Sequence, residues 1–204
     1  AYLLYVGDPD ARFLTRSSAP VLYLRELARA LDNTLADQRR LANRLSYLLY
    51  QYFPAATRLF AHVESLVCLA FLEAYSTPQA ARALTRTQLR QFLKQQKYTF
   101  LSRTDAIYAH LQQPMPTTSF CDGYVAQVQI LIPQLRQLHH TRVRLEREVP
   151  AAFRGHPEAE WWRSLPGARC PLTSARLLAW VGDDRNRFPT PATLQAVAGT
   201  APVT

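Results

Sequence analysis

The sequence predicts a mainly α-helical fold. Only 6 of the 204 residues are glycine, while Leu, Ala, Arg and Gln are abundant, and this composition favours helices over a sheet-rich fold. Apolar residues recur at spacings of three and four along residues 20–52 and 123–149, which is the period of an amphipathic helix. Hydrophobic residues make up 48% of the chain, so wholesale disorder is excluded.

The first long helix is predicted over residues 20–52. Pro54 ends it, because proline lacks an amide donor and disfavours helix in the residue before it. The apolar stripe of this helix consists of Leu24, Leu27, Leu31, Leu35, Leu41, Leu45 and Leu49. We expect the arginines at its more polar positions to form a solvated face, namely Arg25, Arg29, Arg39, Arg40 and Arg44.

A group of shorter helices is predicted next. Residues 58–75 are apolar nearly all round, which predicts one buried helix. Ser76-Thr77-Pro78 then has the form of an N-cap followed by proline in the first turn. Thr85 with Gln88 three residues later resembles a capping box, which would open another helix over residues 86–97.

Positive charge is concentrated in this group of helices. Residues 79–103 hold six basic residues and no acidic one, against a formal net charge of +9 for the whole chain. Four of these residues share one helical face, because spacings of four, four and three separate Arg86, Arg90, Lys94 and Lys97. Unpaired like charges on one face destabilise a helix. An anionic partner would relieve that repulsion and gain counterion release, whereas a merely solvated face is the alternative. The candidate nucleic-acid contacts are Arg82, Arg86, Arg90, Lys94 and Lys97.

A proline-punctuated loop over residues 112–122 leads into the second long helix, predicted over residues 123–149. Two long helices that bracket a helical insert of about residues 76–110 suggest an antiparallel, coiled-coil-like hairpin. Through these helices we expect copies of the chain to form a homo-oligomer. Pro133 predicts a kink or a break inside the second helix.

The last unit, residues 158–204, follows a linker at residues 150–157 and has the outline of a helix-hairpin-helix. Leu165-Pro166-Gly167-Ala168 would form the hairpin and residues 172–179 the next helix. Such a hairpin lets backbone amides approach a phosphate, toward which the next helix points its N-terminus. Arg169-Cys170 stands where the usual hairpin has a second glycine, and a purely structural turn is the alternative. The candidate contacts are Gly167, Arg169 and Arg176.

Several classes of protein are excluded by the sequence. No run approaches about 18 consecutive apolar residues, so we expect no membrane-spanning helix. The three cysteines are far apart and odd in number, which suits free thiols in a reducing cytoplasm better than a disulfide framework. No pair of Cys or His residues has the spacing of zinc ligands. The positive net charge favours a polyanion as partner.

The C-terminal pattern LPGA, followed by SARLLAWVGDDRNRFPTPATLQAVAGTAPVT, resembles the DEDD insertion-sequence transposases of the one-ten family. These in turn resemble the bridge-RNA-guided recombinases of bacterial mobile elements. Earlier segments agree. QRRLANRLSYLLYQYFP is similar to the family's first coiled-coil helix, and AYSTPQAARALTRTQLRQFL is similar to its helical insert.

The resemblance implies a protein that cuts and joins DNA strands. In the family a RuvC-like nuclease domain holds divalent metal through three Asp and one Glu, and a later domain carries a nucleophilic serine. By this resemblance residues 1–19 end the nuclease domain, residues 20–150 are the coiled-coil region and residues 158–204 begin the serine-bearing domain. The implied partner is DNA, with a guide-type RNA as a further candidate, and the implied cofactor of the full-length protein is Mg²⁺.

The resemblance also places the chain between two catalytic groups. The chain opens with Ala1-Tyr2-Leu3-Leu4. By the resemblance, the family's last metal-binding aspartate would come immediately before this segment. The chain ends with Ala201-Pro202-Val203-Thr204, which the family's serine would follow. A competing alignment puts Asp10-Ala11-Arg12-Phe13-Leu14 on the aspartate motif, but Gly7 stands where the partner aspartate should be.

We therefore expect a catalytically incomplete fragment that binds nucleic acid and has no catalytic or metal-binding residue of its own. The alternative is a non-catalytic helical module for protein–protein interaction, or a degenerate relic of a transposase.

Overall fold

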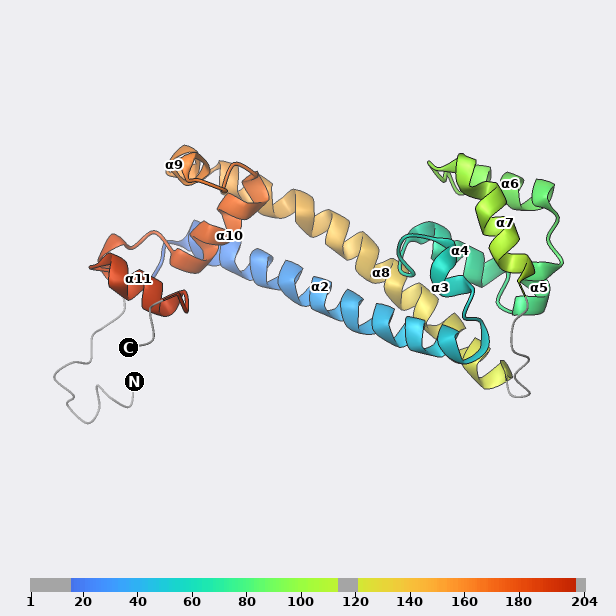
Figure 1. The fold of residues 1–204 in the computed structure, drawn as a ribbon. Helices are drawn as coiled ribbons and strands as arrows, with labels where there is room; N and C mark the ends of the chain where they lie inside the picture. The colour runs from blue at the N-terminus through green and yellow to red at the C-terminus, as the bar shows by residue number, and fades with distance from the viewer. Residues whose placement is uncertain (1–15, 114–120, 201–204) are drawn as a thin grey trace. The chain divides into compact units, whose positions relative to one another are not determined.

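The structure, a computed structural model, describes residues 16–113 and 121–200. All regular secondary structure in these residues is helical, which confirms the predicted mainly α fold (Figure 1). The chain divides into two compact units, one formed by the chain up to Leu31 and from Leu145 onward (unit 1) and the other by Asp32–Arg144 (unit 2). The two long helices α2 (Ala19–Tyr52) and α8 (Cys121–Arg154) each contribute to both units.

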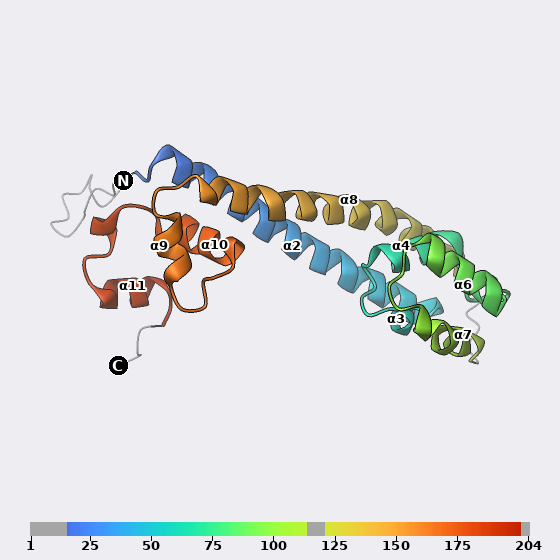
Figure 2. The same cartoon turned by 90° about the horizontal axis from the view of Figure 1, so that it is seen from above.

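In unit 2 the helices α2 and α8 lie side by side and run in opposite directions (Figure 2). Arg44 on α2 donates a hydrogen bond to Gln127 on α8 over 3.4 Å. Further along α2, the Tyr52 ring lies parallel to that of Tyr124, with 6.2 Å between the centroids. A later residue of α2 is therefore paired with an earlier residue of α8, as expected for antiparallel helices. A coiled-coil description of the pair stays a prediction.

The described residues between α2 and α8 form five short helices. They are α3 (Ala56–Leu59), α4 (Leu66–Ala74), α5 (Pro78–Arg82), α6 (Arg86–Gln95) and α7 (Thr104–Gln112), with a 3₁₀ turn over Leu101–Arg103 before α7.

The prediction of one buried helix over residues 58–75 is wrong, since α3 and α4 are separate. Phe60 ends α3 in an extended conformation, with φ of −125° and ψ of 163°. The turn brings its ring to 6.0 Å from that of Phe71, edge to face, in the core of the unit. Residues 58–75 are apolar nearly throughout, so they have no hydrophobic periodicity from which the position of this turn could be predicted.

The predicted helix starts are confirmed at two threonines. The Thr77 hydroxyl accepts a hydrogen bond from the amide of Ala80 over 3.2 Å. Thr85 and Gln88 form the complete capping box, because the Gln88 amide donates to the Thr85 hydroxyl and the Thr85 amide donates to the Gln88 side chain over 2.8 Å. Each cap satisfies amides that a helix leaves without partners in its first turn.

The helix α6 ends two residues earlier than predicted, so Lys97 lies beyond it. The amide of Tyr98 donates to the carbonyl of Leu93 over 2.9 Å, and that of Lys97 donates to the carbonyl of Lys94 over 3.0 Å. This pair of bonds is the Schellman motif, whose left-handed position is usually glycine. Lys97 occupies it with φ of 53°.

The core of unit 2 draws on every helix from α2 to α8. Its aromatic centre is a set of edge-to-face and tilted contacts among Phe60, Phe71, Tyr75, Phe92 and Tyr98. Such ring pairs add about 0.5–1.5 kcal/mol each beyond the area that they bury. Because Leu89, Phe92 and Leu93 point into this core, the remaining face of α6 is directed to solvent.

Of the predicted kink or break at Pro133, the break is wrong because the helix α8 continues through this residue, and the kink stays a prediction. Pro133 is exposed, and water can satisfy the carbonyl that its missing amide leaves free. The same helix continues past Pro150 to Arg154, so the predicted linker is helical over its first five residues.

Unit 1 adds α9 (Ala159–Ser164), α10 (Pro171–Val181), a 3₁₀ turn over Arg185–Arg187 and α11 (Pro191–Val197) to its parts of α2 and α8. Its buried side chains come from several of these helices and include Val21, Leu24, Leu31, Val149, Phe153, Trp162 and Leu178.

Asp183 holds the N-terminus of α2 within unit 1. The amide of Ser18 donates to both oxygens of the Asp183 carboxylate, over 3.2 and 3.3 Å. Partial burial raises the pKa of Asp183, but the hydrogen bonds from Ser18 outweigh it, so the pKa lies below its usual range. A negative charge at a helix N-terminus is also stabilised by the helix dipole.

Replacing Lys97 with glycine should raise the free energy of unfolding by about 0.5–1 kcal/mol. A side chain in the left-handed region costs on the order of 1 kcal/mol, and glycine removes that cost. Urea unfolding followed by circular dichroism measures the change. The matched control is Lys94→Gly, which lies inside α6 and should instead lower the free energy by nearly 1 kcal/mol. Equal losses in both variants would contradict the Schellman assignment.

Replacing Asp183 with asparagine should destabilise the protein at neutral pH and not in acid. The folded-state pKa of Asp183 is depressed, so its contribution is present above the unfolded-state pKa of about 4 and is lost as the pH falls through the folded-state value. Unfolding of Asp183→Asn and the parent protein, compared at pH 7 and near pH 2.5, measures this. A difference that persists unchanged in acid would show that the charge of Asp183 is not responsible.

Candidate nucleic-acid interface

Three cations stand in a row on the solvent face of α6. Arg86, Arg90 and Lys94, which we call the cation row, follow one another at intervals of four residues and are all exposed. This interval keeps side chains on one side of a helix. The cation row therefore points away from the core that holds α6 in place.

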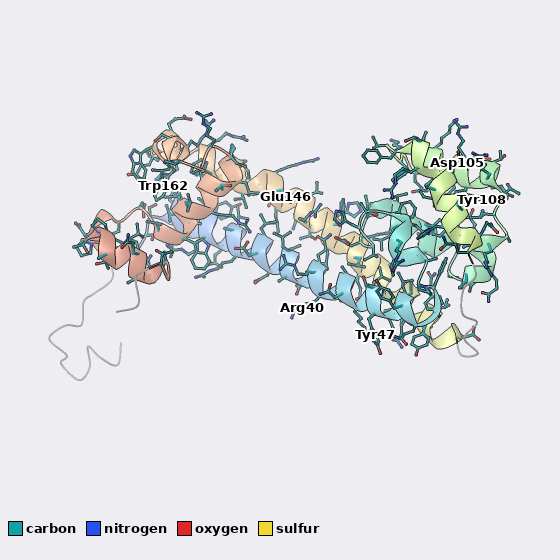
Figure 3. The ribbon with its side chains drawn as sticks, viewed as in Figure 1. Arg40, Tyr47, Asp105, Tyr108, Glu146 and Trp162 are labelled. Atoms are coloured by element: carbon teal, nitrogen blue, oxygen red, sulfur yellow. The ribbon has the colours of Figure 1, made fainter. Side chains whose placement is uncertain are left out.

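The structure corrects the prediction that all these cations are unpaired. Asp105, labelled in Figure 3, lies in the first turn of α7. It accepts a hydrogen bond from Arg86 Nε over 2.5 Å and pairs with Arg86 Nη2 as well. The hydrogen bond from Arg86 holds the pKa of Asp105 below its usual range, with a further contribution from the charge of Arg90. The same pair raises the pKa of Arg86. Asp105 lies just outside the acid-free stretch, so that window could not reveal it.

The other two cations of the row remain available. The side chains of Arg90 and Lys94 form no ion pair or hydrogen bond with any residue in the described part of the chain. Arg86 and Arg90 line a cleft of about 530 Å³ together with the hydroxyl-bearing residues Thr87 and Ser102 and the carboxylate of Asp105, among others. Guanidinium and hydroxyl groups are the donors that most often contact phosphate oxygens.

Arg82 and Lys97 do not join the cation row. Arg82 donates to the carbonyl of Gln113 over 2.5 Å, and Gln112 donates back to the carbonyl of Arg82 over 3.2 Å, so its guanidinium supports the end of α7. Lys97 lies beyond the helix end and is exposed. Their role in nucleic-acid binding stays a prediction.

The second candidate site is the turn between α9 and α10. Gly167 has φ of 77° and open space around its Cα. The amide of Ala168 is used within the turn, since it donates to the carbonyl of Leu165 over 3.0 Å. Ser174 is fully buried and its hydroxyl donates to the carbonyl of Ala168, which fixes the turn against α10.

Cys170 is the residue before α10, and its side chain makes no capping hydrogen bond. The backbone amides of Thr173 and Leu172 lower the pKa of the Cys170 thiol. By contrast, burial raises the pKa of Cys68 to about 12. Arg169 is exposed beside the turn, whereas Arg176 is half-buried. The use of Gly167, Arg169 and Arg176 as phosphate contacts stays a prediction.

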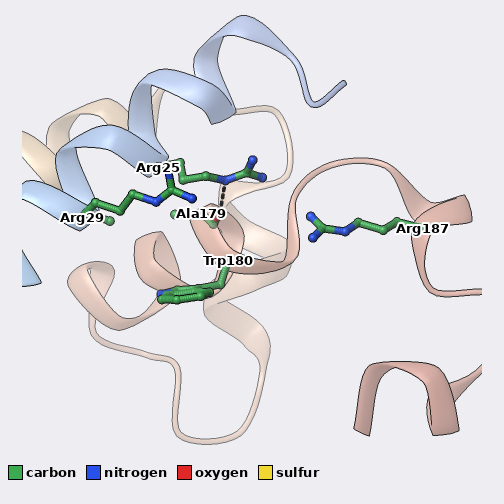
Figure 4. A pocket seen from close by; sticks show the side chains of 6 residues that line it. Arg25, Arg29, Ala179, Trp180 and Arg187 are labelled. Carbon is green, nitrogen blue, oxygen red and sulfur yellow. Dashed lines mark hydrogen bonds between the residues drawn. The ribbon is translucent and has the colours of Figure 1, made fainter. Parts of the chain in front are cut away.

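A third cluster was not predicted from the sequence. In unit 1 the side chains of Arg25, Arg29, Trp180 and Arg187 line one small pocket (Figure 4). The arginines were predicted as a solvated helix face or were not singled out, because the pocket joins residues from both ends of the chain. The only local signal is Trp180 itself, a large aromatic residue at the end of an amphipathic helix.

The described residues contain no candidate metal site and no membrane-spanning helix. In residues 16–113 and 121–200, no three His, Cys, Asp or Glu side chains come together as a metal site. No helix in the same residues is long and apolar enough to cross a bilayer. The two end segments next to which the resemblance places the catalytic groups, residues 1–15 and 201–204, lie outside the described residues.

Two curated proteins from Streptomyces are similar to the chain. A Streptomyces coelicolor protein named "Mini-circle putative transposase for IS117" is 32% identical over 191 residues, which cover 87% of this chain and 45% of that protein. A Streptomyces clavuligerus protein named "Insertion element IS116 uncharacterized 44.8 kDa protein" is 29% identical over 194 residues, which cover 93% of this chain and 47% of that protein. No family model and no solved structure matches the chain.

The chain thus spans about half the length of the curated relatives that it matches. One relative is named as a transposase, and both names refer to insertion elements. The DEDD assignment and the link to bridge-RNA-guided recombinases stay predictions. At the coarser level, the similarity supports an insertion-sequence transposase family for the chain.

Proposed function

We propose that the chain is a DNA-binding part of an insertion-element transposase and that the cation row on α6 contacts the phosphate backbone. The observation that carries the proposal is the pair Arg90 and Lys94, whose side chains are exposed and form no ion pair or hydrogen bond in the described residues. Two like charges one turn apart cost the helix a few tenths of a kcal/mol. Phosphates would offset this cost and release counterions.

The third member of the row can also serve a phosphate. Arg86 and Asp105 form an exposed ion pair, with side-chain exposures of 64% and 62%. Exposed pairs of this kind contribute little to stability. A nucleic-acid phosphate can therefore replace the Asp105 carboxylate at little cost, or bind the guanidinium beside it.

We also propose a second phosphate contact, a further ligand and a way in which copies of the chain associate. The turn around Gly167 with Arg169 and Arg176 is a second, weaker phosphate contact, because the Ala168 amide is used within the turn and Arg176 is half-buried. A guide-type RNA is a candidate ligand of the same surfaces, and a homo-oligomer is proposed through α2 and α8. Mg²⁺ belongs to the longer proteins of the family. To the described residues we assign binding and not strand cleavage.

The second candidate function is a helical module for protein–protein interaction. It is favoured by the exposed tyrosines of α2, since Tyr47 and Tyr50 are 63% and 57% exposed and Tyr is enriched where proteins meet. This module would not need the cation row, so the two functions differ in their response to salt and to loss of charge.

Replacing Arg86, Arg90 and Lys94 together by glutamine should weaken duplex DNA binding at least tenfold. It should also lower the slope of log affinity against log salt by about 2 to 3, since each phosphate contact contributes about 0.9 to that slope. Fluorescence anisotropy with a labelled duplex and a labelled RNA hairpin, over a series of salt concentrations, measures both quantities. Glutamine keeps helix propensity and avoids new repulsion with Asp105.

The matched control replaces Arg39, Arg58 and Arg147 by glutamine. These three are also exposed, and none has an ion pair within the described residues, so the net charge changes equally. The control should keep nearly the full salt slope. Equal losses in both variants would leave only a diffuse charge effect and refute the cation row as the contact. Absence of nucleic-acid binding at low salt would favour the interaction module.

A further inference from the structure

The pocket at the end of α10 combines a flat aromatic surface with three cations. Trp180 is 69% exposed, and its ring has no aromatic or cation–π partner within the described residues. Arg25, Arg29 and Arg187 line the same pocket (Figure 4). An exposed tryptophan costs hydrophobic free energy that a stacked ring would recover.

Arg25 is the fixed part of this pocket. Its Nε donates to the carbonyl of Ala179 over 2.8 Å, and its Nη2 donates to the hydroxyl of Ser17 over 3.1 Å. These bonds tie α2 to the last turn of α10, next to Trp180. They leave Nη1 without a partner among the described residues. Arg25 therefore offers a donor whose position is already set by the fold.

The other two arginines can move to a ligand at little cost. Arg29 pairs with Glu26 over 2.9 Å, but the two side chains are 61% and 69% exposed, so the pair is weak. Arg187 is exposed, with its guanidinium 5.2 Å from the centroid of the Phe188 ring and one long, exposed hydrogen bond of 3.5 Å from Nη1 to the carbonyl of Val181. None of the residues that line the pocket is acidic.

The size of the pocket restricts the ligand. Its volume is about 120 Å³, well below the roughly 300–1,000 Å³ that encloses a free small molecule. One planar ring and one phosphate on the open side of the pocket are what its shape and charge accommodate. The bases of duplex DNA are stacked on each other and cannot reach a protein ring unless they are unpaired.

We propose that Trp180 stacks on an unpaired base of a single-stranded nucleic acid, while Arg25, Arg29 and Arg187 contact the phosphate next to it. Base–aromatic stacking beside guanidinium groups is a general means of holding single strands. The inference deepens the proposed function and rests on it for the presence of nucleic acid. The ligand chemistry is an unpaired nucleotide, which single-stranded DNA or RNA can supply.

The test compares Trp180→Ala, Trp180→Phe and the parent protein. The probes are a labelled oligothymidylate, an oligouridylate of equal length and a hairpin duplex. Trp180→Ala should weaken single-strand binding by roughly 5- to 150-fold, the range for loss of one stacked base, and should leave duplex affinity within about twofold. Trp180→Phe should keep most of the affinity because it keeps an aromatic ring. The stronger of the two single-strand probes identifies the source of the nucleotide.

Two controls separate stacking from damage to the fold. Tyr23→Ala removes another aromatic side chain of unit 1, 61% exposed and outside the pocket, and should leave single-strand binding unchanged. Quenching of tryptophan fluorescence gives an independent signal, which single strands should produce in the parent protein and which Trp180→Phe should abolish while binding persists.

The inference is overturned if Trp180→Ala binds single strands within about twofold of the parent protein. It is equally overturned if duplex affinity falls by the same factor, or if Trp180→Phe keeps the quenching. These outcomes are distinct from failure of the proposed function, which loss of the α6 cation row tests on duplex DNA. If Trp180→Ala loses single-strand binding while the α6 glutamine variant keeps its duplex affinity and salt slope, the pocket is supported and the cation row is refuted.

Discussion

Burial of one face of the two 34-residue helices is the constraint on which the rest of the structure depends. Helices of this kind are stable in water chiefly because neighbours cover their apolar stripes. In unit 2 the insert helices share a core with α2 and α8, and in unit 1 the stripe of α2 is buried at Leu24 and Leu31. Both candidate surfaces are consequences of that burial. Leu89 and Leu93 turn the cation row of α6 outward, and Leu178 anchors the helix that ends at Trp180.

The net charge of +9 overstates the charge that a ligand can use. Several guanidinium groups already hold the protein together. Arg82 supports the end of α7, Arg25 joins α2 to α10, and Arg136 pairs with Glu73. Turning Arg82 or Arg136 to a phosphate would leave a carbonyl or carboxylate unsatisfied. Arg25 differs, since its Nη1 has no partner in the described residues while Nε and Nη2 stay bonded. The cations that can be used without this loss are those with no partner or with only an exposed, weak one. Most residues of the cation row and of the rim of the Trp180 pocket are of this kind. The proposed binding therefore rests on these two surfaces and not on the basic composition of the chain.

Local signals in the sequence were sufficient for what depends on neighbouring residues. The two long helices, the Thr77 cap and the Thr85–Gln88 capping box follow from periodicity and from spacings of three, and the structure has all of them. Contacts between distant residues could not be predicted in this way. The turn at Phe60 depends on its packing against Phe71, and the end of α6 depends on a lysine that adopts a left-handed conformation. The candidate site follows the same division. The row of cations was visible in the sequence, but its pairing with Asp105 was not, and neither was a pocket that joins Arg25 to Trp180 across most of the chain.

The two surfaces use different parts of a nucleic acid, and this makes their contributions separable. Contacts between the α6 row and phosphates gain most of their free energy from counterion release, which declines steeply as salt rises. Stacking on Trp180 involves little net charge, so its contribution changes much less with salt. The arginines around the pocket add a salt-dependent part, but at most three of them can act there. Raising the salt concentration should therefore shift the balance of binding from paired toward unpaired nucleic acid. Such a shift requires a protein with one surface for the backbone and another for an exposed base, and a uniformly basic helical module would lose both kinds of binding together.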